Sequence, residues 1–157
     1  MTDDLSLPDE AATLRLGAAC VAGAANGTSL HLRGELGAGK TTLVRGLLRE
    51  LGYQGRVRSP TYTLVEPYGD LRLNCYHFDF YRVKDRAEWL NSGFREYFNA
   101  DSLCIVEWPE RAGNLIAPPD LDIHLQYRGE ARSAALAAPT PAGDAWLASV
   151  LQRWRSA

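Results

Sequence analysis

The chain has 157 residues and 46% of them are hydrophobic, which suits one domain over residues 1–157 whose core needs no disulfide or metal to fold. Its formal net charge of -2 argues against a domain whose main task is to grip nucleic acid, because such domains normally carry a basic patch for the phosphates. No apolar run approaches the roughly 20 residues that span a bilayer, and the N-terminus has no basic segment of the kind that opens a secretion signal. We therefore expect a cytoplasmic protein with no membrane contact.

Three cysteines, Cys20, Cys75 and Cys104, lie far apart in apolar stretches and form no CxxC pair. This spacing is typical of buried, reduced thiols in a cytosolic protein. We expect neither a disulfide nor a zinc site.

The first third of the chain predicts a helix, a strand and a second helix. Pro8 suits a first helical turn, and apolar residues recur at helical spacing as far as Ala25, before Asn26 and Gly27 stop the pattern. A short, partly apolar strand over residues 29–33 then enters a glycine-rich loop, residues 34–39. A leucine-striped helix follows at once and stops at Gly52.

The rest of the chain predicts a mixed set of elements around one buried strand. Residues 103–106 form a uniformly apolar run of the kind found in a central strand. Two strands joined around Gly69 and Asp70 predict a hairpin, and so some antiparallel pairing. In chain order we expect an irregular stretch at 56–60, strands at 62–67 and 71–78, a helix at 87–98 broken near Gly93, strands at 103–106, 121–127 and 132–137, and a C-terminal helix with Trp146, Val150 and Trp154 on its apolar face.

The segment GELGAGKTT, which begins at Gly34, fits the phosphate-loop pattern GxxxxGK[ST] without a gap. Glycines let successive backbone N–H groups face a phosphate, and the helix that follows presents its positive end to the same anion. Lys40 would then contact the β- and γ-phosphates and the Thr41 hydroxyl would ligate Mg²⁺, and we expect Lys40 to be exposed in the empty site. The alternative is a glycine-rich turn that caps an ordinary helix. The predicted nucleotide-binding residues of this segment are Gly34, Glu35, Leu36, Gly37, Ala38, Gly39, Lys40, Thr41 and Thr42.

Hydrolysis also needs a carboxylate at the end of a neighbouring strand, to hold the metal or to orient water. Glu107 directly follows the apolar run and would emerge at the carboxyl end of a buried strand, where ligands gather in α/β sheets; it could be a metal ligand, a base or a solvated acid. Asp79 lies in YHFDFYR, where alternation places it on the same side as His77. Asp79 is a second catalytic candidate, although it could instead pair with Arg82 or cap the backbone. We interpret His77 as a structural histidine.

Two further residues are candidates by position. Ser59, Pro60 and Thr61 follow the glycine-rich loop by one helix and one loop, which is where switch-type NTPases place a hydroxyl that senses the γ-phosphate. Thr61 is therefore the third catalytic candidate, and the alternative is a plain turn before a strand. Trp108 could border the nucleotide or simply pack in the core.

The segments GELGAGKTT, SPTYTLVEPY, YHFDFYR and CIVEWPER together resemble, in order and spacing, the TsaE family of bacterial ATPases over residues 30–112. The resemblance implies an α/β fold, the three-layer P-loop NTPase domain with a mixed, partly antiparallel central sheet. It implies ATP and Mg²⁺ as ligands, with hydrolysis that is weak outside a complex. The implied partners are TsaD and TsaB, which make the N6-threonylcarbamoyl modification of adenosine 37 in tRNA, so that contact with tRNA is indirect. Residue by residue, it assigns phosphate binding to Lys40, the metal site to Thr41 and Glu107, the HxDxYR aspartate to Asp79, the switch-like threonine to Thr61, and the tryptophan after the glutamate to Trp108.

Two other readings stay open. A small-molecule kinase would use the same loop to pass phosphate to an acceptor, although the chain offers little room for a lid or an acceptor pocket. A nucleotide-dependent adaptor would need no hydrolysis, since a bound γ-phosphate could by itself bias the loop at residues 56–61.

Overall fold

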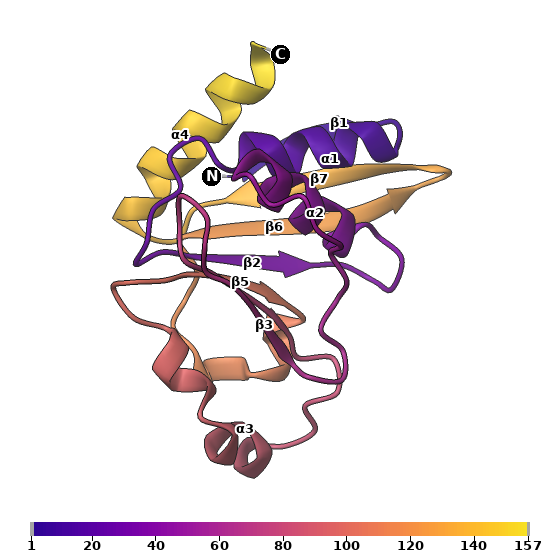
Figure 1. The fold of residues 1–157 in the computed structure, drawn as a ribbon. Coiled ribbons are helices and arrows are strands. Elements are labelled where there is room, and N and C mark those ends of the chain that lie inside the picture. The colour runs from indigo at the N-terminus through magenta and orange to yellow at the C-terminus, as the bar shows by residue number, and fades with distance from the viewer. Residues whose placement is uncertain (1, 157) are drawn as a thin grey trace.

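The computed structural model describes residues 2–156 and contains one seven-stranded sheet in the order β1-β7-β6-β2-β5-β4-β3 (Figure 1). Within those residues no helix is long and apolar enough to cross a membrane. The strands are β1 Thr2–Leu7, β2 Ser29–Arg33, β3 Val65–Tyr68, β4 Cys75–Asp79, β5 Leu103–Glu107, β6 Leu121–Arg128 and β7 Ala131–Ala137. The α-helices are α1 Glu10–Ala19, α2 Lys40–Glu50, α3 Arg86–Ser92 and α4 Pro141–Arg155, and the 3-10 helices are η1 Phe94–Tyr97, η2 Pro109–Arg111 and η3 Gly113–Leu115.

The sheet mixes parallel and antiparallel pairs, as expected. The central pairs β2 with β5, β2 with β6 and β4 with β5 are parallel, whereas β1 with β7, β6 with β7 and β3 with β4 are antiparallel. Because carboxyl ends of parallel strands share one edge, the register brings Asp79 beside Glu107 and Glu107 beside Leu32. The glycine-rich loop starts from the same edge, so three predicted site segments meet there.

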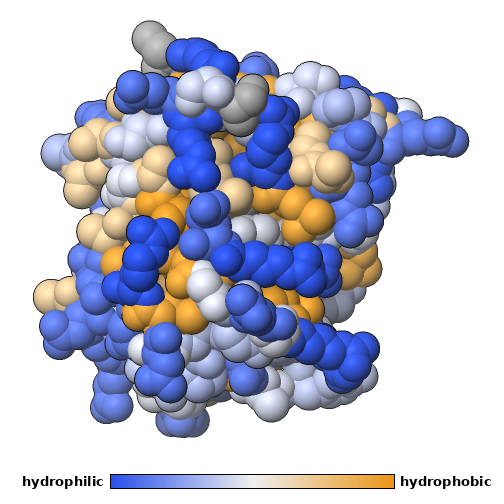
Figure 2. All heavy atoms as spheres, turned by 45° about the horizontal axis from the view of Figure 1, so that its top comes forward, coloured by the Kyte–Doolittle hydropathy of each residue, from blue (hydrophilic) through white to orange (hydrophobic). Residues whose placement is uncertain are grey.

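One face of the sheet is covered by α1, α2 and α4 (Figure 1). Glycines let α1 and α2 pack in close contact, since a Cβ on Gly17 would overlap the carbonyl oxygen of Leu43 and one on Gly46 would overlap that of Leu14. Outside this layer Figure 2 shows mostly hydrophilic side chains with hydrophobic ones between them. Leu43, Val44 and Leu47 of α2 are buried in this core, and their packing positions the start of the helix.

The other face of β4 and β5 is covered by α3 and η1, which Figure 1 shows beyond the sheet from α1 and α2. Phe78 and Phe80, from β4 and its extension, pack there against Trp89 and Phe94 with ring centroids 4.9 to 5.8 Å apart. Helices thus lie on both sides of β4 and β5, in the three-layer order that the sequence predicts.

Most predicted elements are confirmed, including the break at Gly93, which has a φ of 77°, and the burial of Cys20, Cys75 and Cys104 as free thiols. Burial raises the pKa of each of these thiols to about 12. They are therefore protonated and unreactive at neutral pH.

The predicted extent of the first helix, to Ala25, is wrong. α1 ends at Ala19: the amides of Val21 and Ala22 bond three residues back and Gly23 takes a left-handed φ of 87°. The Ala24 amide bonds the carbonyl of Val21, and the carbonyl of Cys20 accepts from Trp146 Nε1 on α4 at 2.8 Å. A continued helix would have needed that carbonyl for Ala24. Residues 2–7, for which no element was predicted, form the edge strand β1, because pairing with β7 overrides the low strand propensity of TDDLSL.

The predicted hairpin is confirmed, but its strands are shorter and later than expected. Residues 62–64 form turns before β3, and Leu64 takes a left-handed φ of 69° while its carbonyl accepts from the amide of Asp79. Residues 69–74 form the connection between the strands. The segment before β3 is therefore not part of the sheet. It lies next to Asp79, at the carboxyl end of β4.

Candidate functional site

The glycine-rich loop joins β2 to α2 in a conformation that its glycines permit. Gly37 and Gly39 have φ values of 79° and 111°, a region that side chains disfavour. A Cβ on Gly34 would come within 2.7 Å of the carbonyl oxygen of Leu125. No side chain caps α2, which leaves its first amides free for an anion.

Two residues of the β6–β7 hairpin brace this loop. Tyr127 donates its hydroxyl to the carbonyl of Leu36 at 2.5 Å, and Arg132 donates to that of Gly37 at 3.4 Å. The guanidinium of Arg132 also lies 4.1 Å from the centroid of the Tyr127 ring. Neither residue was predicted, and no local pattern marks them, because each lies more than 90 positions from the loop residue whose carbonyl it contacts.

Lys40 is only 5% exposed, so the expectation of an exposed lysine is wrong. Its ammonium folds back over its own loop, where it donates to the carbonyls of Gly34 and, at 3.0 Å, of Glu35. Nζ also lies 4.4 Å from the centroid of the Trp108 ring. Burial lowers the pKa of Lys40, and the carboxylates of Glu107 and other nearby acids oppose the shift.

Thr41 and Glu107, the two predicted metal ligands, are in direct contact. The Thr41 hydroxyl lies 3.0 Å from Oε2 of Glu107 and 3.3 Å from Oε1. His77 contacts the same carboxylate, with Nε2 2.6 Å from Oε2. Glu107 is 3% exposed and His77 fully buried, so this group is largely shielded from bulk water.

Asp79 ties the 59–61 segment to the sheet edge. It accepts hydrogen bonds from the hydroxyls of Ser59 and, at 3.4 Å, Thr61, and from the amide of Tyr81 at 2.9 Å. Arg82, the alternative partner of Asp79, has its guanidinium 4.4 Å from the Tyr62 ring centroid instead. Ser59, which is not among the predicted site residues, makes a closer contact with Asp79 than Thr61 does.

Trp108 borders the site in a strained backbone conformation, with φ 58° and ψ 48°. Its ring lies against that of Tyr81, with centroids 4.8 Å apart. The turn at Trp108 places its ring over Lys40 while the preceding residue, Glu107, stays at the end of β5.

Most predicted site residues line one cavity of about 270 Å³, the loop cavity. Gly34, Glu35 and Ala38 do not line it but shape the loop behind it. The lining residues are Leu36, Gly37, Gly39, Lys40, Thr41, Thr42, Ser59, Thr61, Asp79, Glu107 and Trp108. A second cavity of about 290 Å³ shares Gly37, Gly39 and Thr42 with it and continues to Asp9, Thr13 and Arg132.

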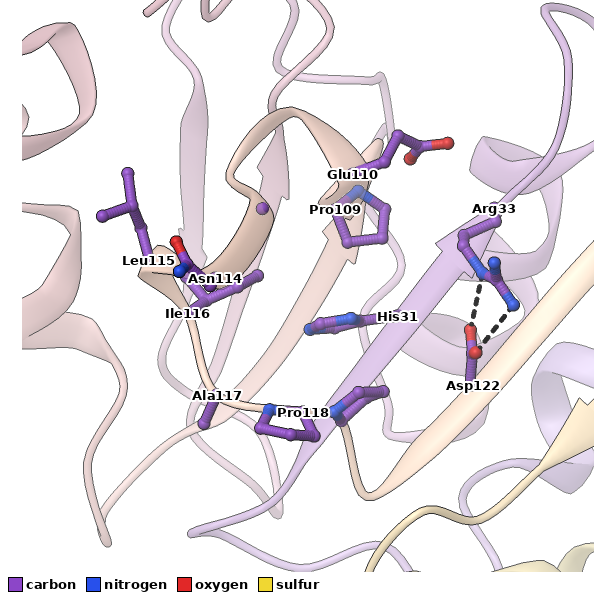
Figure 3. A pocket seen from close by; sticks show the side chains of 12 residues that line it. His31, Arg33, Pro109, Glu110, Asn114, Leu115, Ile116, Ala117, Pro118 and Asp122 are labelled. Carbon is purple, nitrogen blue, oxygen red and sulfur yellow. Dashed lines mark hydrogen bonds and ion pairs between the residues drawn. The ribbon is translucent and has the colours of Figure 1, made fainter. Parts of the chain in front are cut away.

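A larger cavity of about 660 Å³ lies between β2, β6 and residues 109–119 (Figure 3). It contains no residue of the predicted site. His31 extends into this space, and Arg33 and Asp122 form a two-pronged ion pair beside it at 2.8 and 3.1 Å. Burial lowers the pKa of His31 to about 4, so its ring is neutral at pH 7.

The donor set of the loop cavity fits Mg²⁺ bound together with phosphate. Among residues 2–156, no group of three or more His, Cys, Asp and Glu side chains is placed to hold a metal ion. Mg²⁺ is usually held by one or two protein oxygens together with phosphate and water. The Thr41 hydroxyl and the Glu107 carboxylate, 3.0 Å apart, can supply that share.

Comparison with known proteins gives one family. Residues 7–134 match the family described as "Threonylcarbamoyl adenosine biosynthesis protein TsaE". The chain is 46% identical over 114 residues to the tRNA threonylcarbamoyladenosine biosynthesis protein TsaE of Haemophilus influenzae, covering 73% of this chain and 72% of that protein. It is 40% identical over 114 residues to the protein of that name in Synechocystis, covering 69% and 71%.

The fold is also similar to a solved structure. The crystal structure of Bacillus subtilis YdiB aligns with a TM-score of 0.84 and 26% sequence identity, over 97% of this chain and 95% of that chain. The family match and the fold agree with the resemblance that the motifs suggest. This chain belongs to the TsaE family, whose members take part in the biosynthesis of threonylcarbamoyladenosine in tRNA.

Proposed function

We propose that this chain binds Mg-ATP at the glycine-rich loop and hydrolyses it, as the ATPase that drives or resets the TsaB–TsaD transferase. The observation that carries the proposal is the meeting of a cation, a hydroxyl and a carboxylate at the loop: Lys40, Thr41 and Glu107 all line the loop cavity. A glycine-rich turn that merely caps a helix would need no buried carboxylate opposite its first threonine.

The chain's own groups divide the work of binding. The amides at the start of α2 and Lys40 would hold the phosphate oxygens, for which the ammonium must leave the carbonyls of Gly34 and Glu35. Thr41 and Glu107 would hold Mg²⁺, which supplies positive charge at the phosphates when bound. The second cavity continues from Thr42 to Thr13 and Arg132, and we propose that it takes the nucleoside.

Asp79 and Thr61 would couple the nucleotide to the partners. Asp79 is 4% exposed and holds the 59–61 segment through two hydroxyls. Oxygens of a γ-phosphate or of its attacking water would compete for those hydroxyls, and so could shift the segment. Asp79 could also orient the water, since it lines the cavity together with Glu107.

Phosphate release from ATP, measured with and without purified TsaB and TsaD, tests this function. We expect release to be slow for the chain alone and faster with the pair. The variant Glu107→Ala should lose the stimulation, whereas the matched control Glu110→Ala, which removes an exposed acid three positions later, should keep it.

The same assay separates the alternatives. Phosphate passed to an added metabolite would favour a kinase. Nucleotide-dependent binding to the pair that survives Glu107→Ala, with no stimulated release in the wild type, would favour an adaptor.

A further inference from the structure

Among the described residues, His77 is the one titratable side chain that is both fully buried and in contact with Glu107. The proposed chemistry gives His77 no role. It lies in β4, two residues before Asp79, opposite Ile105 of β5. Its Nε2 is 2.6 Å from Oε2 of Glu107, with 0% of the side chain exposed. A histidine that only filled the core would not need this contact with a buried carboxylate.

The surroundings of the ring define which nitrogen donates. Nδ1 is enclosed and has no hydrogen-bond partner among the described residues. A hydrogen on Nδ1 would therefore be a buried donor without an acceptor, which costs about 1–3 kcal/mol. The arrangement favours a hydrogen on Nε2, donated to the Glu107 carboxylate.

This bond makes the two oxygens of Glu107 unequal. Oε2 accepts from both His77 and Thr41, whereas Oε1 has only the 3.3 Å contact with the Thr41 hydroxyl. If Thr41 turns toward a metal ion, Oε1 is left without a protein donor and Oε2 is still held by His77. The carboxylate would then present one free oxygen from a fixed position.

We infer that His77 is a positioning residue, which holds Oε2 of Glu107 so that the carboxylate is ready to bind Mg²⁺ before the metal arrives. The inference rests on the proposed Mg-ATP site and extends it. Groups that hydrogen-bond a metal ligand typically contribute about 10- to 100-fold to metal affinity, because they fix the orientation of the ligand in advance. His77 would act on the metal step alone, since it does not line the loop cavity.

Nucleotide binding measured in EDTA and across a Mg²⁺ titration tests the inference. His77→Leu keeps much of the volume but removes the donor. We expect its half-saturating Mg²⁺ concentration to rise about 10-fold or more, with its affinity for ATP in EDTA unchanged. His77→Gln, whose amide can reach the same carboxylate, should restore most of the Mg²⁺ response.

The matched control is His31→Leu, the same change at another buried histidine, on β2, whose Nε2 has no partner among the described residues. It should leave both affinities unchanged. Circular dichroism and thermal melting show whether each variant is folded; if His77→Leu does not fold, His77→Asn replaces it, because its shorter side chain does not reach Glu107.

An unchanged Mg²⁺ response in His77→Leu or His77→Asn would overturn the inference. So would an equal loss in EDTA and in Mg²⁺, which would show a structural role, or an equal loss in His77→Gln. A wild-type chain that binds no nucleotide would instead remove the proposed function, and with it this inference. A wild type that responds to Mg²⁺ beside an unaffected His77 variant would remove this inference alone.

Discussion

The two buried histidines mark two regions of very different design. His77 sits at the carboxyl edge of the sheet, where buried charged groups are held by hydrogen bonds around a cavity of about 270 Å³. His31 extends into a cavity of about 660 Å³ in which the nearby ion pair is satisfied within itself. The larger space is the poorer candidate for chemistry. Buried, interacting acids and cations indicate a functional site better than volume does.

The largest effect should come from Lys40→Ala. Removing the ammonium deletes charge-assisted hydrogen bonds to phosphate, each worth about 1.5–3 kcal/mol, so we expect the affinity for ATP to fall about 100-fold. Titration calorimetry measures it. The control is Lys84→Ala, which removes an exposed lysine outside the loop cavity and the second cavity. Equal affinities for the two variants would show that Lys40 does not bind the nucleotide.

The His31 region should affect stability instead of binding. The pKa of His31 is about 4 in the folded chain, compared with an ordinary value of 6.5, which we take for the unfolded chain. Between these two pH values the unfolded state binds a proton that the folded state does not. Stability is therefore complete above pH 6.5 and falls as the pH drops toward 4. Between pH 7 and pH 5 the loss from this group is about 2 kcal/mol.

Denaturant unfolding at the two pH values, for the wild type and for His31→Leu, measures this loss. The variant should lose about 2 kcal/mol less than the wild type on acidification. Equal losses in the two proteins would contradict the account of a buried, neutral ring at His31.

A smaller effect is expected from Asp79→Asn. The amide can still accept from the Tyr81 N–H, but it offers one acceptor oxygen in place of two for Ser59, Thr61 and that N–H. We expect stimulated phosphate release to fall about 10-fold, or about 1.4 kcal/mol, and amide exchange at residues 59–64 to become faster. Glu66→Gln, an exposed change on β3, serves as the comparison; slower release without faster exchange would separate Asp79 from the loop.

The sequence predicts this site where the signal is local. The glycine-rich loop is contiguous, and Glu107 follows an apolar run that is typical of a buried strand, so both positions are predicted from neighbouring residues. The brace by Tyr127 and Arg132 cannot be predicted in this way, because it depends on how a distant hairpin packs.

The predictions that were wrong, and the strand that was missed, also depend on contacts between distant parts of the chain. The burial of Lys40 depends on the Trp108 ring, which lies against its ammonium. Trp108 follows another strand, β5, and has a left-handed backbone conformation that no local sequence pattern predicts. α1 gives way to a turn at Gly23 where α4 packs against it through the bond from Trp146 to the Cys20 carbonyl, and β1 forms because β7 offers it an edge to pair with. Tertiary contacts decide these features, and periodicity alone carries no information about them.

The central claim is that the glycine-rich loop holds a triphosphate together with Mg²⁺. Titration of ATP into the purified chain, once in Mg²⁺ and once in EDTA, tests it most directly. The account predicts one site per chain that binds more tightly in Mg²⁺, and loss of this difference in Glu107→Ala. Absence of binding, or an affinity that is the same in Mg²⁺ and in EDTA, would contradict it.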